Sequence, residues 1–447
     1  MSHITICGTA PLRGEISLQR AKNSVLPVLA ATLLHRGQSC IRDCPVLSDV
    51  EAAIDILRHL GCPVAWQGRD LLVDASSLTG CTIPPALMHR CRASVLFLGA
   101  LLGRCGEAEL SFPGGCFLGP RPIDMHLSAL QTLGAEITVR GEKLRCCAPR
   151  LCGREIRLPF PSVGATENTI LAAAAAEGVT VISNAAREPE IADLQTFLLK
   201  LGVHIHGAGT STVAIRGSQQ LRDAHHRCIG DRIVAATYLC ATAAAGGQIT
   251  VKDADYRHLS PVLTALQQAG CTVRSTADTI TLSSNGGHLQ AVDTVRTAPY
   301  PGFPTDAQPL LMAALLRARG ETTFIETMFE NRYRHVPQLR KMGADICLAD
   351  RCAAVCGVER LCGAQVSAPD LRGGAALMIA ALSAEGTTQI HDIHHILRGY
   401  EDVTDNFRAL GAQINQGNNE GGDIAWHDAT VTTANGGGAD FPCCISF

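Results

Sequence analysis

One short phrase recurs six times along the 447-residue chain and constrains its fold more than any other feature. In each copy an apolar residue precedes a glycine, and a small or apolar residue follows it. The six glycines are Gly61, Gly134, Gly202, Gly270, Gly343 and Gly411. Successive glycines lie 73, 68, 68, 73 and 68 residues apart, and the first three precede the last three by 209 residues each. Such a period indicates repeated supersecondary units, so we expect two similar halves of three units each.

Each unit has the same predicted order of elements. A helical pattern ends at the repeated glycine, which suits a helix C-terminus, and a β-branched strand follows. In the first unit, Ser48-Asp49-Val50-Glu51 fits a capping box at the start of this helix. A glycine turn and a strand, such as 178–182 or 247–251, lie upstream of the helix. The pattern predicts an α/β fold.

A second predicted helix in each unit is rich in alanine and leucine, which indicates burial in the centre of a domain. These helices are expected to begin near Lys22, Arg92, Gly164, Arg232, Asp306 and Arg372. Four of them open with a cation, although the helix dipole disfavours positive charge at that end. The ordinary interpretation is a set of caps and solvated ends. The alternative is an anionic ligand, because helix N-termini favour anions.

Two loops carry residues suited to catalysis. Segment 112–126 contains three glycines and three prolines, and its Cys116 lies five residues before Arg121, a cation that favours a thiolate. The alternative is one more buried cysteine. Segment 297–306 delivers Asp306 to the start of a buried helix. An aspartate there is either a favourable helix start or a general base facing the same cleft as the cations.

Charge and composition exclude several classes of protein. The chain has 38 Lys plus Arg against 41 Asp plus Glu, which argues against a nucleic-acid partner bound by bulk charge. With 46% hydrophobic and 18% charged residues, the sequence suits a large core and not disorder. We find no export signal, and no apolar stretch reaches the roughly 18 residues of a membrane span. We expect a cytoplasmic protein without membrane insertion.

Twenty cysteines are spread over the chain, and no pair has the Cys-x-x-Cys spacing that zinc sites favour. Disulfide scaffolds are typical of short secreted chains. We therefore expect reduced thiols, most of them buried as small apolar residues, and no metal site.

Ten motifs together carry a resemblance to a known family. They are Ala21-Lys22-Asn23, Arg92-Ala93-Ser94, Pro113-Gly114-Gly115-Cys116, Arg121-Pro122-Ile123-Asp124, segment 162–166, segment 184–190, segment 300–306, Phe329-Glu330-Asn331-Arg332, Asp370-Leu371-Arg372 and Arg398-Gly399-Tyr400. With these motifs, the chain from about Ile4 to Ile414 resembles the UDP-N-acetylglucosamine 1-carboxyvinyltransferases, a family of enolpyruvyl transferases.

The resemblance implies two pseudo-threefold domains, each an inside-out α/β barrel of three units, with the active site in the cleft between them. It also implies that the N-terminal strand pairs into the second domain. The expected domains are thus 22–229, and 1–21 with 230–414. The glycine-rich and asparagine-rich segment 415–447 is expected to form a flexible tail. Because ligands are expected from both domains, we also expect the domains to close on the UDP-sugar.

The implied reaction transfers the enolpyruvyl group of phosphoenolpyruvate to the 3′-hydroxyl of UDP-N-acetylglucosamine and releases phosphate, which opens peptidoglycan precursor synthesis. By resemblance, Cys116 is the proton donor, adds covalently to phosphoenolpyruvate and is alkylated by the epoxide fosfomycin. Asp306 takes the hydroxyl proton, and Lys22 is the third catalytic residue. The family uses no cofactor.

The resemblance also assigns the binding residues. The implied phosphoenolpyruvate site consists of Lys22, Asn23, Arg121 and Arg398. The implied UDP-sugar site consists of Arg92, Arg121, Pro122, Ile123, Asp124, Met125, Ser162, Val163, Gly164, Asp306 and Met328. Arg232 and Arg372 are expected to add positive charge to the cleft.

Two other functions compete with this one, and one residue departs from the family pattern. The sister enzyme 5-enolpyruvylshikimate-3-phosphate synthase shares the fold and the phosphoenolpyruvate chemistry, but lacks the Pro-Gly-Gly-Cys loop. A catalytically silent paralogue would bind UDP-sugar as a sensor. The family usually has glycine before the Ala-Lys-Asn motif, whereas this chain has Arg20, which either shifts the approach of the chain to Lys22 or adds an exposed charge.

Overall fold

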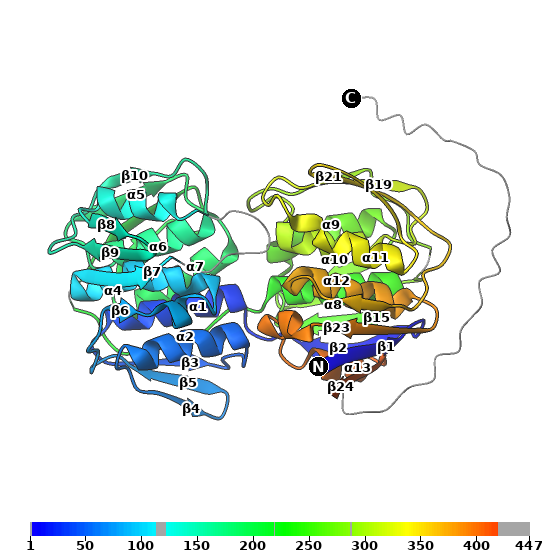
Figure 1. The fold of residues 1–447 in the computed structure, drawn as a ribbon, viewed down its shortest axis with the longest axis horizontal. Helices are drawn as coiled ribbons and strands as arrows, with labels where there is room; N and C mark the ends of the chain where they lie inside the picture. Colours follow the sequence, from blue (N-terminus) through cyan, green and yellow to red (C-terminus); the bar gives the residue numbers. More distant parts are fainter. Residues whose placement is uncertain (1, 113–121, 219, 287, 419–447) are drawn as a thin grey trace.

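The structure, a computed structural model, describes residues 2–112, 122–218, 220–286 and 288–418 (Figure 1). Cys116, Arg121 and the expected tail beyond residue 418 lie outside the described residues. Within the described ranges, no helix is long and apolar enough to cross a bilayer.

Six four-stranded sheets contain all the named strands, and each has one parallel and two antiparallel neighbour pairs. The first half contributes β3 (Gln38–Arg42), β4 (Val64–Gln67), β5 (Asp70–Asp74) and β14 (Ala224–Arg227); β6 (Thr82–Ile83), β7 (Glu107–Ser111), β8 (Glu136–Arg140) and β9 (Lys143–Cys147); and β10 (Glu155–Arg157), β11 (Val179–Ser183), β12 (His204–His206) and β13 (Thr212–Arg216). The second half contributes β2 (Leu12–Ser17), β15 (Gly247–Lys252), β16 (Thr272–Ser275) and β17 (Thr279–Ser284); β18 (Thr294–Arg296), β19 (Glu321–Ile325), β20 (Asp345–Ala349) and β21 (Cys352–Cys356); and β1 (Ser2–Cys7), β22 (Gln365–Ser367), β23 (Thr387–His391) and β24 (Gln413–Asn418).

Two helices accompany each sheet, as the repeat predicts. The apolar central helices are α1 (Lys22–Ala31), α4 (Phe97–Cys105), α6 (Val163–Ala173), α8 (Arg232–Ala245), α10 (Gln308–Ala314) and α12 (Leu371–Ser383). The amphipathic helices are α2 (Ser48–His59), α5 (Asp124–Thr132), α7 (Pro189–Leu201), α9 (Ser260–Gln268), α11 (Val336–Lys341) and α13 (Val403–Ala409). A short α3 (Pro85–Met88) and the 3-10 helices η1 (Thr32–Leu34), η2 (Arg92–Leu96), η3 (Tyr256–Leu259), η4 (Thr305–Ala307), η5 (Arg332–His335) and η6 (Ile393–Arg398) complete the set.

The six repeated glycines end the amphipathic helices in the left-handed region, with φ between 91° and 108°. Glycine adopts this conformation without the steric cost that a Cβ atom brings, which explains its recurrence. The capping box predicted at Ser48 is wrong. The residue before α2 is Leu47, and no side chain caps the helix. The Asp49 carboxylate accepts hydrogen bonds from Lys22 and Arg398 instead.

The buried apolar residues form two separate cores, one in each of the two groups of helices and strands that lie side by side in Figure 1. One spans Val25 to Cys228, and the other combines 4–18 with 233–414. The second core includes the N-terminus because β1 pairs with β23 and β24, and β2 pairs with β15. In its centre α8, α10 and α12 pack against one another, inside their three sheets. Strand β24 continues to Asn418, past the expected end of the domain at Ile414.

All seventeen described cysteines are free thiols, but only eight of them are fully buried. The expectation that most are buried apolar residues is therefore wrong for this part of the chain. Cys105, Cys347 and Cys362 are exposed. Burial raises the pKa of the enclosed thiols, as at Cys62, where it rises to about 11.

Candidate active site

Lys22 and Arg398 meet at one buried carboxylate, although one opens α1 in the first half and the other ends η6 in the second. Lys22 Nζ lies 3.0 Å from Asp49 Oδ2, and Arg398 Nε lies 2.9 Å from Asp49 Oδ1. The Asp49 side chain is 3% exposed. Burial raises its pKa, but the two cations lower it more, so the pKa lies below the usual aspartate value. The structure thus brings together two of the predicted phosphoenolpyruvate ligands.

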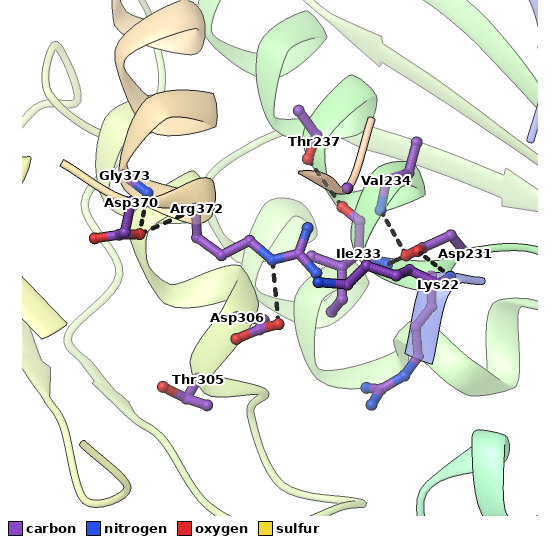
Figure 2. A network of polar contacts seen from close by, with 12 residues as sticks. Lys22, Asp231, Ile233, Val234, Thr237, Thr305, Asp306, Asp370, Arg372 and Gly373 are labelled. Atoms are coloured by element: carbon purple, nitrogen blue, oxygen red, sulfur yellow. Dashed lines mark hydrogen bonds and ion pairs between the residues drawn. The ribbon is translucent and has the colours of Figure 1, made fainter. Parts of the chain in front are cut away.

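Asp306 lies in η4 between two buried arginines of the second half. Arg332 donates to Asp306 Oδ1. Arg372 Nε donates to Oδ2 of the same carboxylate over 3.1 Å (Figure 2). Arg372 also donates to the Tyr400 hydroxyl over 3.4 Å, which fixes the guanidinium. Burial raises the pKa of Asp306, but the charges of Arg372 and Arg332 outweigh it and hold the pKa well below its usual range. The carboxylate is ionised, oriented and 29% exposed.

Two aspartates that received no role in the sequence analysis precede two of the three central helices of the second half. Asp231 accepts hydrogen bonds from Ile233 N and Val234 N at the start of α8 and, over 3.2 Å, from Lys22 N (Figure 2). Asp370 accepts from Arg372 N and Gly373 N at the start of α12. Aspartate immediately before a helix is a recognised cap signal, so both were detectable in the sequence.

At three of the helix starts the cation pairs with a carboxylate of the protein. Lys22 pairs with Asp49, Arg372 with Asp306, and Arg232 with Glu190 over 2.9 Å. The fourth cation, Arg92, begins η2 and is half-buried. An anionic substrate is therefore not needed to explain the cations at these three positions. A substrate that binds there must either share the cation with the existing carboxylate or displace that carboxylate.

The predicted UDP-sugar residues of the first half converge through α6, which packs against both η2 and α5. Arg92 begins η2, Asp124 and Met125 begin α5, and Ser162 caps α6 by accepting from Ala165 N over 3.3 Å.

Two members of this set have structural roles that their assignment did not anticipate. Ile123 is 4% exposed and belongs to the hydrophobic core, so its side chain packs inside the protein. At Gly164 a Cβ atom would lie 3.0 Å from His126 Cε1, so any larger residue here would require the packed histidine ring to shift by a few tenths of an ångström.

The remaining predicted residues lie at the edges of the site. Asn23 and Pro122 are exposed, and Val163 is half-buried at the start of α6. Met328 donates its N–H to Glu326 Oε1 over 2.7 Å. The same glutamate accepts from Thr305 Oγ1 over 3.0 Å, which ties the Met328 loop to η4.

Asp193, His226 and Cys228 are buried with their ligand atoms within 4.8 Å of one another, the spacing of a metal site. Their hydrogen bonds favour a different role. Lys200 Nζ lies 3.1 Å from His226 Nδ1, and an ammonium only donates, so Nδ1 accepts and Nε2 carries the proton. Nε2 lies 3.0 Å from Asp193 Oδ1 and donates to it, which leaves no ring lone pair for a metal. Ser24 donates to the same carboxylate, so the network ties α7 to α1.

Comparison with known proteins identifies the family. Residues 6–407 match the family described as EPSP synthase (3-phosphoshikimate 1-carboxyvinyltransferase). UDP-N-acetylglucosamine 1-carboxyvinyltransferase 2 of Caldanaerobacter subterraneus subsp. tengcongensis is 48% identical over 93% of this chain and 99% of the relative. UDP-N-acetylglucosamine 1-carboxyvinyltransferase of Finegoldia magna is 44% identical over 93% and 98%. The chain belongs to the UDP-N-acetylglucosamine 1-carboxyvinyltransferase family. It is an enolpyruvyl transferase, as the motifs predicted.

Solved structures confirm the fold expected for the family. The enolpyruvyl transferase NikO of Streptomyces tendae superposes with a TM-score of 0.82 at 26% identity, covering 93% of this chain and 98% of that one. An EPSP synthase of Acinetobacter baumannii gives a TM-score of 0.71 at 16% identity, over 94% and 100% of the two chains, which shows the fold alone.

The sequence analysis identified most of the charged residues of this enolpyruvyl transferase site but missed several of the residues that pair with them. Arg332 and Glu190 lay inside quoted motifs, but neither received a role. Asp49 was interpreted only as an inner position of the capping box predicted from Ser48 to Glu51. Its function as the shared partner of Lys22 and Arg398 depends on a contact across 349 positions, for which the sequence carries no local signal.

Proposed function

We propose that this enolpyruvyl transferase uses phosphoenolpyruvate as donor and the 3′-hydroxyl of UDP-N-acetylglucosamine as acceptor, releasing phosphate. The observation that carries the proposal is the fixed Asp306 carboxylate between Arg332 and Arg372, within the electrostatic reach of Lys22. This arrangement supports the proposal, because a carboxylate that can accept a proton lies beside a group of cations. An enolpyruvyl transfer needs both, because a hydroxyl loses its proton while an anionic donor is bound.

Lys22 and Arg398 bind the phosphate of phosphoenolpyruvate in this proposal, with Asn23 and Arg121 beside them. A planar guanidinium and an ammonium both suit a phosphate. Asp49 holds the two cations only 3.0 and 2.9 Å from its oxygens, so they are oriented before the substrate arrives. Phosphate binding then requires the cations to share their charge between Asp49 and the substrate.

Asp306 orients the 3′-hydroxyl and accepts its proton. Its lowered pKa makes Asp306 a weak base in the free enzyme. The proton therefore moves to Asp306 only after the 3′-oxygen has attacked phosphoenolpyruvate, because the attack makes the hydroxyl more acidic. The 3′-oxygen bonds to C2 of phosphoenolpyruvate while Cys116 donates a proton to C3. The C2–oxygen bond to phosphate then breaks and phosphate leaves with the proton that Asp306 accepted. A C3 proton returns to the Cys116 thiolate, which restores both the double bond and the thiol.

The UDP-sugar is proposed to lie along η2, the start of α5 and the start of α6. These three segments carry Arg92, the run 122–125 and 162–164. Arg92 supplies a cation for the diphosphate, and the N-terminus of α6 supplies unpaired N–H groups. Asp306 and Met328 face the sugar from the second domain, and Arg232 and Arg372 add positive charge. The proposed domains are 22–229, and 2–21 with 230–418.

Turnover with two acceptors tests the proposal. Phosphate release from phosphoenolpyruvate is measured with UDP-N-acetylglucosamine or shikimate 3-phosphate, for the parent, Asp306→Ala and Cys116→Ala. We expect turnover with the UDP-sugar alone and its loss in Asp306→Ala. Turnover with shikimate 3-phosphate would assign the chain to the sister activity. Binding of UDP-sugar without turnover would support the silent paralogue.

Three further expectations belong to the same proposal. Small-angle scattering should show compaction with saturating UDP-N-acetylglucosamine, because domain closure brings the two sets of ligands together. Intact-mass analysis after fosfomycin treatment should place one adduct on Cys116. We also propose a cytoplasmic location, as the sequence analysis expects. Fluorescence microscopy of a tagged chain tests it.

A further inference from the structure

The two halves of the molecule are joined by two short connectors that run antiparallel to each other. The first connector is 18–21, between β2 and α1, and the second is 228–231, between β14 and α8. Ala21 N donates to Ile229 O over 2.8 Å, Asp231 N donates to Gln19 O over 3.0 Å, and Arg20 faces Gly230. The first connector leads directly to Lys22. The contact between the two connectors therefore determines how Lys22 is oriented in the site.

Arg20 joins both halves at this contact. Its Nη2 lies 2.6 Å from Asp253 Oδ2, and its Nε lies 3.0 Å from Asp43 Oδ2 in an ion pair without hydrogen-bond alignment. Asp43 directly follows β3 of the first half, and Asp253 directly follows β15 of the second. The Arg20 side chain is 4% exposed, so the prediction of an added exposed charge is wrong.

Two more arginines complete a balanced set of charges. Arg227 contacts the same two aspartates from the solvent side, at 3.2 and 3.3 Å. Arg69 joins Asp43 to Glu401 of the second half, at 2.8 and 3.0 Å. We call these six residues the hinge cluster: Arg20, Arg69, Arg227, Asp43, Asp253 and Glu401. Burial raises the pKa of Asp43, but hydrogen bonds and charge from the arginines lower it more, so the carboxylate is ionised.

The internal repeat shows that Arg20 is an asymmetric addition. Position 230 follows position 20 by 210 residues, the same offset that separates Asp43 from Asp253. The equivalent residue is Gly230, where a Cβ atom would lie 2.2 Å from the carbonyl oxygen of Asp253. The point where the two connectors meet therefore has room for one side chain only. That side chain is Arg20, which contacts Asp43 of the first half and its equivalent Asp253 of the second.

We propose that Arg20 is a positioning residue that clamps the two domains through the hinge cluster and so determines how Lys22 faces the second half of the site. A buried guanidinium with a carboxylate from each domain resists rotation of one domain against the other, because rotation would leave the buried charge of Arg20 without a partner. The carboxylates of Asp43 and Asp253 are 30% and 32% exposed. Arg227 is 48% exposed and contributes less to the clamp, since water screens it.

The kinetic consequence is a change in apparent affinity. A looser hinge lowers the fraction of molecules with Lys22 and Arg398 correctly placed, and apparent affinity falls in proportion to that fraction. Bound substrates restore the arrangement, so turnover at saturation changes little. This kinetic part rests on the proposed function, whereas the effect on the connectors does not.

Hydrogen exchange tests the clamp independently of activity. We compare the parent with Arg20→Gln, Arg20→Lys and the matched control Arg145→Gln, whose partner Glu107 lies on a neighbouring strand of the same sheet. In Arg20→Gln we expect about tenfold faster exchange in peptides covering the amides of Ala21 and Asp231, an effect typical of local opening. Exchange in α8 should not change. Arg20→Lys retains one ion pair and should give an intermediate rate.

Steady-state kinetics provide the second test. We expect Arg20→Gln to raise KM for phosphoenolpyruvate about fivefold, the lower end of typical coupling between sites, with kcat within about twofold. Lower kcat with unchanged KM, unchanged exchange at the connectors, or equal effects in Arg145→Gln would each overturn the proposal.

A second variant covers the case in which Arg20→Gln does not fold. Asp253→Asn keeps Arg20 and removes its partner from the second half, and we expect the same direction of change in exchange and in KM. Adding Arg20→Gln to Asp253→Asn should then raise KM by less than Arg20→Gln does in the parent, because part of the clamp is already lost. Full additivity would show that the two residues act separately and would contradict the clamp. If no UDP-sugar turnover is found, the exchange measurements still decide the question.

Discussion

Arg398 donates from Nε to Asp49 over 2.9 Å, although 349 positions separate the two residues in the chain. The contact joins the end of η6 to the first turn of α2 and so crosses from one domain to the other. Because Lys22 binds the other oxygen of the same carboxylate, Asp49 fixes two predicted phosphate ligands at once. The site is therefore ordered by an internal anion before any substrate binds.

Replacing Asp49 with asparagine should lower the free energy of unfolding by about 2 kcal/mol at pH 7, because two cations lose a buried counter-ion. The folded-state pKa of Asp49 is lowered, so its stabilisation is present above the unfolded value of about 3.9 and is lost as pH falls through the folded value. The deficit of Asp49→Asn should therefore shrink below about pH 4. Urea unfolding at several pH values measures it. The exposed pair of Asp405 with Arg408 provides the control, and Asp405→Asn should change stability by less than about 0.5 kcal/mol.

Removing one guanidinium from Asp306 should make its carboxyl group easier to protonate. In the parent, Arg372 and Arg332 hold the pKa of Asp306 well below its usual range, so the carboxylate is ionised throughout the working pH range. In Arg332→Gln that pKa rises, and the acid limb of kcat/KM should move to higher pH. The pH profile of phosphate release measures the shift. An unchanged acid limb would show that another group determines it.

Glu167 should destabilise the fold increasingly as pH rises. It is 4% exposed, its Oε1 has no partner in the described structure, and burial together with Glu190 and Glu188 raises its pKa well above the usual value. The unfolded chain releases its proton from about pH 4.3, while the folded chain retains it, so stability falls from there up to the folded pKa.

We therefore expect Glu167→Gln to raise the melting temperature at pH 7 to 8 but not at pH 4. Differential scanning calorimetry at both values checks it. Glu136→Gln, at an exposed position in β8, should leave the melting temperature unchanged at either pH. A stabilisation by Glu167→Gln that is independent of pH would contradict a titration effect.

Two equivalent glycines should differ in their response to alanine. Gly61 and Gly270 both have positive φ, at 91° and 100°, so each alanine should cost about 1 kcal/mol in backbone strain. At Gly61 a Cβ atom would also lie 2.5 Å from Thr79 Oγ1, whereas at Gly270 it would meet nothing within 4 Å. Gly61→Ala should be the more destabilising, by about a further 1 kcal/mol, since overpacking adds to strain. Guanidinium unfolding compares them, and kcat should be unchanged in both.

The sequence by itself determined the repeated architecture of this protein, because helix termination by glycine and the periodicity of apolar residues are local properties. Gly61 and Gly411 marked their helix ends without any knowledge of the fold. The motifs around Lys22 and Asp306 likewise identified the family. The starts of α8 and α12 were predicted to within one residue, since their cations mark a change from polar to apolar sequence.

Only the tertiary structure decided which charges meet. Asp49 has the local sequence of a helix cap, but a salt bridge between distant residues has no local pattern, so its partnership with Arg398 was not predictable. Arg20 shows the same limit. Its sequence position allowed either an exposed charge or a displaced lysine, and burial between Asp43 and Asp253 excluded the exposed charge. Counter-ions are selected by folding, because Coulomb energy depends on distance in space and on burial, and not on separation along the chain.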